Sequence, residues 1–100
     1  MKHAQLWIRW RHGLHMRPAV RLVKLARSFR SSISLRIGRR VADARSITAI
    51  MLLCGTLGTV VDLEAAGSDE EVAVNAIAEL FESEDRDESE DASGDDNPQA

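Results

Sequence analysis

Gly13-Leu14-His15-Met16-Arg17-Pro18-Ala19 lies at the boundary between a predicted strand and a predicted helix. Before this segment, apolar residues alternate with Trp7 and two arginines over Gln5–Arg11, which is the period of a half-buried strand. The apolar set is Leu6, Ile8 and Trp10. Pro18 has the fixed φ angle and the missing N–H that suit a first helical position, so we expect a helix over Arg17–Arg27.

A histidine at this boundary has a defined electrostatic environment. The backbone N–H groups of the first helical turn and the positive end of the helix dipole favour an anion, above all a phosphate. We expect Met16 and Arg17 to supply these N–H groups, and the Arg17 guanidinium to add a planar cation. The positive field disfavours the imidazolium, so His15 should be neutral and nucleophilic near pH 7. The segment therefore predicts a histidine that receives a phosphoryl group and passes it on.

The remaining elements are predicted from short periodic runs separated by turn residues. Further strands are expected over Ser32–Ile37, Arg40–Ala44 and Thr59–Ala65, the first two joined by a Gly38-Arg39 hairpin turn. A short helix is expected over Ile47–Leu53, with Ser46 as its N-cap and Gly55 as its terminating glycine.

A third helix is predicted to begin at the capping box Ser68-Asp69-Glu70-Glu71. Its apolar face should hold Val72, Ala73, Ala76, Ile77, Leu80 and Phe81, and that of the first helix Ala19, Leu22, Val23 and Ala26. The order β-α-β-β-α-β-α favours an α+β fold, with the helices packed on one face of an antiparallel sheet.

Several segments of the chain together resemble the HPr family, the small phosphocarriers of the bacterial phosphoenolpyruvate-dependent phosphotransferase system. They are residues 13–19, 44–47, 51–53 and 58–70, in order and without gaps, and the similarity spans about residues 2–83. The resemblance implies a sheet of strand order 1-4-2-3, phosphorylation of His15 and stabilisation of the phosphoryl group by Arg17. It also implies a carrier rather than an enzyme, without a cofactor, that is charged by enzyme I and discharged by an enzyme IIA-type acceptor.

A cationic stripe on the first predicted helix flanks His15. Its residues beyond Arg17 are Val20, Arg21, Lys24 and Arg27, and Ile47 and Met51 should add an apolar patch beside them. Such a surface suits transient docking on an acidic partner, and in HPr proteins the matching surface meets enzyme I and the enzyme IIA domains. A merely solvated helix face is the alternative.

Ser46 has a structural role as an N-cap, and the resemblance adds a regulatory one. In HPr proteins of many Gram-positive bacteria, a dedicated kinase phosphorylates the matching serine. Here Arg45 and Thr48 depart from the regulated pattern. Control by an HPr kinase at Ser46 therefore stays open beside the cap.

Charge divides the chain into two parts. Residues 1–81 hold twelve basic and seven acidic residues, a balance of +5, whereas residues 82–100 have a balance of −8. We expect one HPr-like domain over residues 1–83 and an acidic disordered tail over residues 84–100. Cys54 is the only cysteine, and the N-terminus has no apolar leader. A soluble cytoplasmic monomer without membrane contact is therefore expected.

Some motifs favour other functions. His12 and His15 have the spacing of a metal pair, but no cysteine or carboxylate lies near them in sequence, so no metal site is expected. His12 stands where the family usually has a small polar residue, and it should either tune the basicity of His15 or face water. Residues 55–58 imitate the GXXG loop of a KH domain, but with four aromatic residues in the chain we expect no nucleic-acid partner.

The branch of the phosphotransferase system stays open at the sequence level. The run Ser46–Leu53, the Ala-rich third helix and the acidic end favour an NPr-like protein of the nitrogen-related branch over a sugar-uptake carrier. The alternative function is a regulatory module of the same fold that acts by docking rather than by phosphoryl transfer.

Overall fold

The computed structural model describes residues 1–83, and the predicted acidic tail, residues 84–100, lies outside the described residues. The described chain forms four strands and three helices in the predicted order. The strands are β1 (Lys2–Trp7), β2 (Ser32–Ile37), β3 (Arg40–Asp43) and β4 (Val60–Ala66). The helices are α1 (Met16–Arg27), α2 (Ile47–Leu52) and α3 (Glu70–Glu82).

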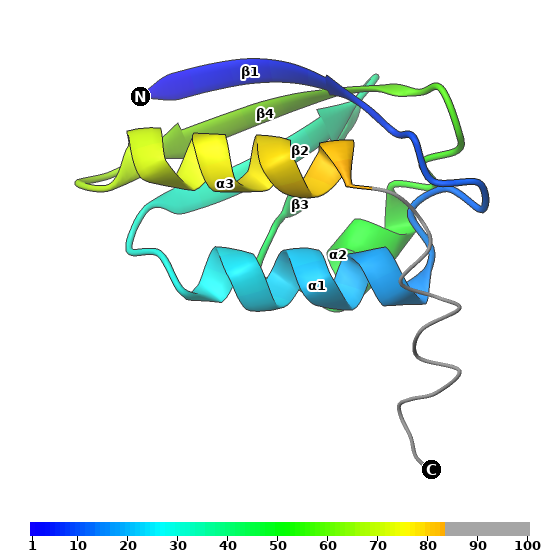
Figure 1. Cartoon of the computed structure of the whole chain (residues 1–100), viewed down its shortest axis with the longest axis horizontal. Coiled ribbons are helices and arrows are strands. Elements are labelled where there is room, and N and C mark those ends of the chain that lie inside the picture. Colours follow the sequence, from blue (N-terminus) through cyan, green and yellow to red (C-terminus); the bar gives the residue numbers. More distant parts are fainter. Residues whose placement is uncertain (84–100) are drawn as a thin grey trace, which may run out of the picture.

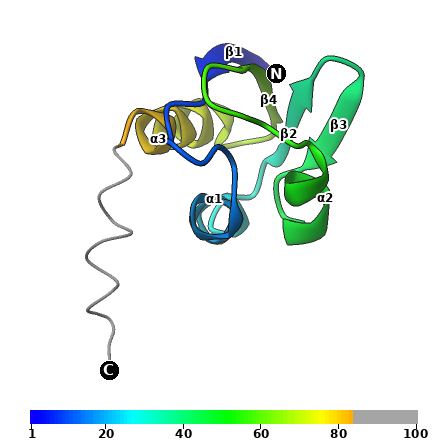
Figure 2. The ribbon, with the colours of Figure 1, turned by 90° about the vertical axis from the view of Figure 1, so that its right-hand side faces the viewer.

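The strands make one antiparallel sheet of order β1-β4-β2-β3, which confirms the predicted α+β fold. All three helices lie on the same side of the sheet (Figure 1), and Figure 2 shows α1 between α3 and α2. The register places Leu6 opposite Val61 and Leu35 opposite Leu63. These side chains are buried under the helices, because alternate residues of a strand point to one face.

The core faces of the helices agree with the sequence pattern except in α3. The four residues predicted to face inward from α1 are all buried. In α3, however, Val72 is 60% exposed and Val74 is buried in its place, while Ala76 is only half-buried. Two residues apart on a helix means about 200° of rotation, so Val72 and Val74 cannot both face the core. Val74 lies on the same side of α3 as the buried residues Ile77, Leu80 and Phe81, so Val74 and not Val72 packs in the core.

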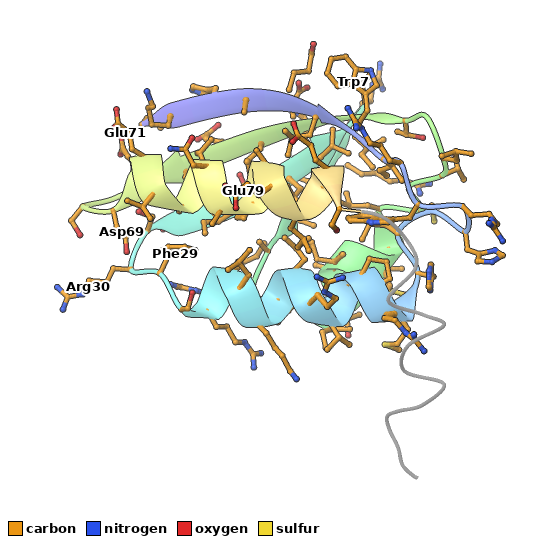
Figure 3. The ribbon with its side chains drawn as sticks, viewed as in Figure 1. Trp7, Phe29, Arg30, Asp69, Glu71 and Glu79 are labelled. Atoms are coloured by element: carbon orange, nitrogen blue, oxygen red, sulfur yellow. The ribbon has the colours of Figure 1, made fainter. Side chains whose placement is uncertain are left out.

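The first strand starts and ends earlier than predicted. Lys2–Gln5 has little apolar alternation, but it pairs with β4, and the N-terminal ammonium forms a salt bridge of 2.7 Å with Glu70. The strand ends at Trp7, opposite Val60, although the Ile8 N–H still donates to the Thr59 carbonyl at 3.0 Å in the loop before β4. Trp10 therefore lies outside the strand, although it is buried as predicted and its ring centroid is 5.0 Å from that of Phe81. Trp7 is half exposed and points from the sheet away from the helices (Figure 3).

Two predicted helix termini are wrong in detail. Helix α1 begins at Met16, so Pro18 is its third residue, a position that also lacks an intrahelical acceptor for an N–H. Helix α2 begins after Ser46 as predicted, and the Ser46 hydroxyl accepts the Ala49 N–H at 3.1 Å. It does not end on Gly55, because Cys54 takes the left-handed conformation at φ 56°.

The predicted capping box at α3 does not form. Asp69, not Ser68, is the N-cap, and its side chain makes no capping hydrogen bond. Its carboxylate instead accepts hydrogen bonds from Ser31 and from the Arg30 backbone. The Glu70 side chain binds the turn before α3, because its Oε1 accepts the Gly67 N–H at 3.0 Å.

Candidate functional site

His15 is the N-cap residue of α1. Its backbone is extended, at φ −85° and ψ −169°, and its carbonyl accepts the Ala19 N–H at 3.0 Å. Its side chain makes no capping hydrogen bond, so the imidazole is not used to satisfy the helix terminus. Pro18 has no N–H, so Met16 and Arg17 are the first-turn residues whose N–H groups have no acceptor within the helix. The predicted phosphate-binding groups therefore belong to the two residues that directly follow His15.

The His15 ring is partly buried and contacts a second imidazole. Its Nε2 atom is buried. The rings of His12 and His15 meet edge-on, with centroids 5.7 Å apart and planes at 82°. His12 itself is exposed, as expected, but it also touches the predicted phosphoryl acceptor.

Two glycines allow the loop before α1 to pack closely on the loop after α2. Gly13 has φ 73°, and a Cβ there would overlap the Gly55 carbonyl oxygen. A Cβ on Gly55 would overlap the Ile8 side chain. The Leu14 N–H donates to the Gly55 carbonyl at 2.9 Å, which fixes the backbone one residue before His15. The sequence analysis assigned Gly55 to helix termination and missed this packing role.

The predicted cationic and apolar residues lie on the adjoining helices α1 and α2, which contact each other. We call their joint surface the α1–α2 surface; its residues are Val20, Arg21, Lys24, Arg27, Ile47 and Met51. The three basic residues are exposed and the three apolar residues are half-buried. Met16 and Leu52, which are 55% and 65% exposed, present more apolar area on the same helices. The sequence analysis did not include the side chains of these two residues in the apolar patch.

The sequence matches a family model described as the PTS HPr component phosphorylation site over residues 2–83. The chain belongs to the HPr family. It is 40% identical to the phosphocarrier protein NPr of Proteus mirabilis over 83 residues, which is 82% of this chain and 92% of that protein. It is also 40% identical to the phosphocarrier protein HPr of Xylella fastidiosa over 70 residues, 70% of this chain and 79% of that one.

Solved HPr structures have the same fold. An HPr crystal structure from Thermoanaerobacter tengcongensis superposes with a TM-score of 0.80 at 40% identity, covering 82% of this chain and 92% of that one. The predicted strand order and helix arrangement of the HPr family are therefore present in this chain.

Three other features of this HPr-family chain bear on its function: the position of His3, the grouping of side chains that could bind a metal, and the length of its helices. His3 is in β1, where its Nδ1 is 3.9 Å from Glu64. Within residues 1–83, no three His, Cys, Asp or Glu side chains are grouped so that they could hold a metal ion. None of the helices in the same residues is long and apolar enough to cross a bilayer.

Proposed function

We infer that this chain, which as a member of the HPr family is a phosphocarrier of the phosphotransferase system, acts through a phosphohistidine. We propose that His15 takes the phosphoryl group from a phosphohistidine of enzyme I and gives it to an enzyme IIA-type acceptor. The observation that carries this proposal is the position of His15 as N-cap of α1, directly before Met16 and Arg17, whose N–H groups have no acceptor within the helix. Such groups receive phosphate oxygens without reorganising.

We further propose that Nδ1 of His15 is the accepting atom, because Nε2 is buried. The Nδ1 lone pair attacks phosphorus as the N–P bond of the donor ring breaks, and the donor ring leaves as a neutral imidazole. Each ring keeps the proton on its other nitrogen, so the transfer needs no added acid, base or cofactor. Positioning and charge neutralisation by Arg17 and the backbone N–H groups then supply the main assistance.

The α1–α2 surface is the proposed docking site for both partners. Its exposed Arg21, Lys24 and Arg27 attract an acidic protein, while its apolar residues and the exposed Met16 and Leu52 supply contact area. The same surface can serve enzyme I and the acceptor in turn, because each must present a histidine to His15. The protein is proposed to act in this way as a monomer in the cytoplasm.

The test is phosphorylation by enzyme I with labelled phosphoenolpyruvate. The expected product is an acid-labile, base-stable label on the native chain, absent from His15→Ala and present in His3→Ala, a matched histidine in β1. Long-range ³¹P–¹⁵N couplings in the labelled protein identify the nitrogen. An unlabelled native chain, or a label that survives in His15→Ala, contradicts the proposal.

A regulatory role is a second candidate function, favoured by the match to an NPr protein over 92% of that protein's length. In that role the chain would act by docking on a partner, as an NPr-like protein of the nitrogen-related branch, and not by phosphoryl transfer. Binding of a partner with equal affinity by the native chain and by His15→Ala would support it. Partner binding that depends on phosphorylation of His15 would favour the carrier role.

A further inference from the structure

We propose that His12 is a second imidazole of the phosphoryl site and holds the phosphoryl group on His15 when His12 is protonated. The proposal rests on the proposed function of His15. It assigns to His12 a positioning role that makes the phosphoryl affinity of His15 depend on pH.

The contact between the two rings carries the proposal. Edge-on rings with centroids 5.7 Å apart leave no room for another side chain between them. A phosphoryl oxygen on the side of the His15 ring that faces His12 can then accept a hydrogen bond from a His12 N–H. His12 is exposed and lies in the turn that Gly13 closes through its N–H to the Trp10 carbonyl, at 2.9 Å. Its ring can therefore turn to follow the phosphoryl oxygens.

The segments next to His12, in sequence or in packing, carry the other ionisable groups of this region. Its own segment contributes Arg9, Arg11 and His15, and α1 contributes Arg17. The loop of residues 54–58, in which Gly55 and Thr56 lie against Gly13, contains the Cys54 thiol. Helix α3 packs on the segment through Phe81 and Trp10, and its last residue is Glu82.

Among these groups, the two histidines are the ones whose ordinary range of titration lies between about pH 5 and 8. Arginine stays charged throughout, and a carboxylate is already ionised. When His15 carries a phosphoryl group, the His12 imidazole is the neighbouring side chain that can add a positive charge in mild acid. An imidazolium neutralises part of the phosphoryl charge and donates a hydrogen bond, whereas a neutral ring keeps only the hydrogen bond. The native chain should hold the phosphoryl group more strongly in mild acid.

The experiment measures how the phosphoryl group distributes between enzyme I and the carrier at equilibrium, near pH 6 and near pH 8. The native chain is compared with His12→Asn, which keeps a hydrogen-bond donor without a titratable charge, and with His12→Arg, which is always charged. Each equilibrium constant is divided by that of His12→Asn at the same pH. This cancels the pH dependence that comes from enzyme I and from the phosphoryl group itself.

The normalised equilibrium constant of the native chain should be about threefold higher near pH 6 than near pH 8, the size expected for an exposed ion pair. That of His12→Arg should be raised at both pH values. Circular dichroism checks that the variants are folded, which is expected because His12 is exposed. If the equilibrium constants of the native chain and of His12→Asn depend on pH in the same way while both chains are labelled, the proposal for His12 is wrong and the proposal for His15 stands. If the native chain is not labelled at all, both proposals are wrong.

Discussion

The Asp69 carboxylate fixes Ser31 in place across two loops. Its Oδ1 accepts the Ser31 N–H at 3.0 Å and the Ser31 hydroxyl at 2.5 Å, and its Oδ2 accepts the Arg30 N–H at 2.9 Å. Ser31 is fully buried, and Asp69 stands beside Arg30 at the end of the molecule where α1 stops and α3 begins (Figure 3). The pair therefore ties the segment after α1 to the start of α3.

The hydrogen bonds of Asp69 to Ser31 and Arg30, called the clamp below, make the free energy of unfolding depend on pH. The Ser31 hydroxyl and then the Arg30 N–H lower the pKa of Asp69 by hydrogen bonding to the carboxylate. A native pKa below the unfolded one means that stability is present at neutral pH and is lost as pH falls through the native value. The difference in unfolding free energy between the native chain and Asp69→Asn should therefore shrink in acid, as measured by urea denaturation.

The control for this prediction is Asp62→Asn. Asp62 is an exposed carboxylate on β4 that accepts one side-chain hydrogen bond, from Gln5 at 3.3 Å. Its substitution should change stability little at any pH. A difference between Asp69→Asn and the native chain that is as large in acid as at neutral pH would contradict the role of the carboxylate charge.

The clamp also illustrates what the sequence could and could not predict. Period and turn residues predict the order of the elements, the Ser46 cap and the buried face of α1, because each depends on neighbours within a few residues. The Ser68–Glu71 motif looks like a local cap, but Asp69 bonds to residues 38 and 39 positions away. No local pattern reveals such a partner.

The functional site divides in the same way. One heptapeptide predicts the start of α1 to within one residue and places His15 at that boundary. The packing of Gly13 on Gly55 and the contact of His12 with His15 depend on how the chain turns between Trp10 and His15. The sequence offered two glycines and a second histidine as signals, but not their spatial relation.

Substitutions at Ser46 separate its structural role from a regulatory one. Ser46→Ala removes the hydrogen bond to the Ala49 N–H and should lower the unfolding free energy by about 1 kcal/mol, with little change in phosphorylation by enzyme I. Ser46→Asp keeps a good N-cap and adds a negative charge next to Ile47, on the α1–α2 surface. It should therefore preserve stability and raise the KM for enzyme I. Thermal unfolding and initial rates measure the two effects, and an unchanged KM in Ser46→Asp would argue against control at this position.

Gly13 should matter for transfer beyond its effect on backbone strain. Gly13→Ala and Gly38→Ala both place a side chain at positive φ, which costs roughly 1–2 kcal/mol. A Cβ at Gly38 meets nothing within 4 Å, whereas one at Gly13 overlaps the Gly55 carbonyl and displaces the loop that holds His15. Gly13→Ala should therefore lose most phosphorylation by enzyme I while Gly38→Ala keeps it, each assayed below its unfolding temperature. Equal rates in the two variants would show that the loop position is unimportant for transfer.

Charge reversal at Lys24 tests whether the α1–α2 surface meets an acidic partner. Lys24 is exposed on α1, and Arg39, exposed in the turn between β2 and β3, is the matched control. Lys24→Glu should raise the KM for enzyme I about threefold at low salt, because an exposed charge pair contributes modestly and acts mainly on the encounter rate. The turnover number should stay unchanged, since Lys24 lies two helical turns beyond the His15 N-cap. High salt should reduce the difference in KM between Lys24→Glu and the native chain, because it screens exposed charges beyond a few ångströms. If Arg39→Glu raises the KM equally, the attraction is a general property of the cationic body and not of this surface.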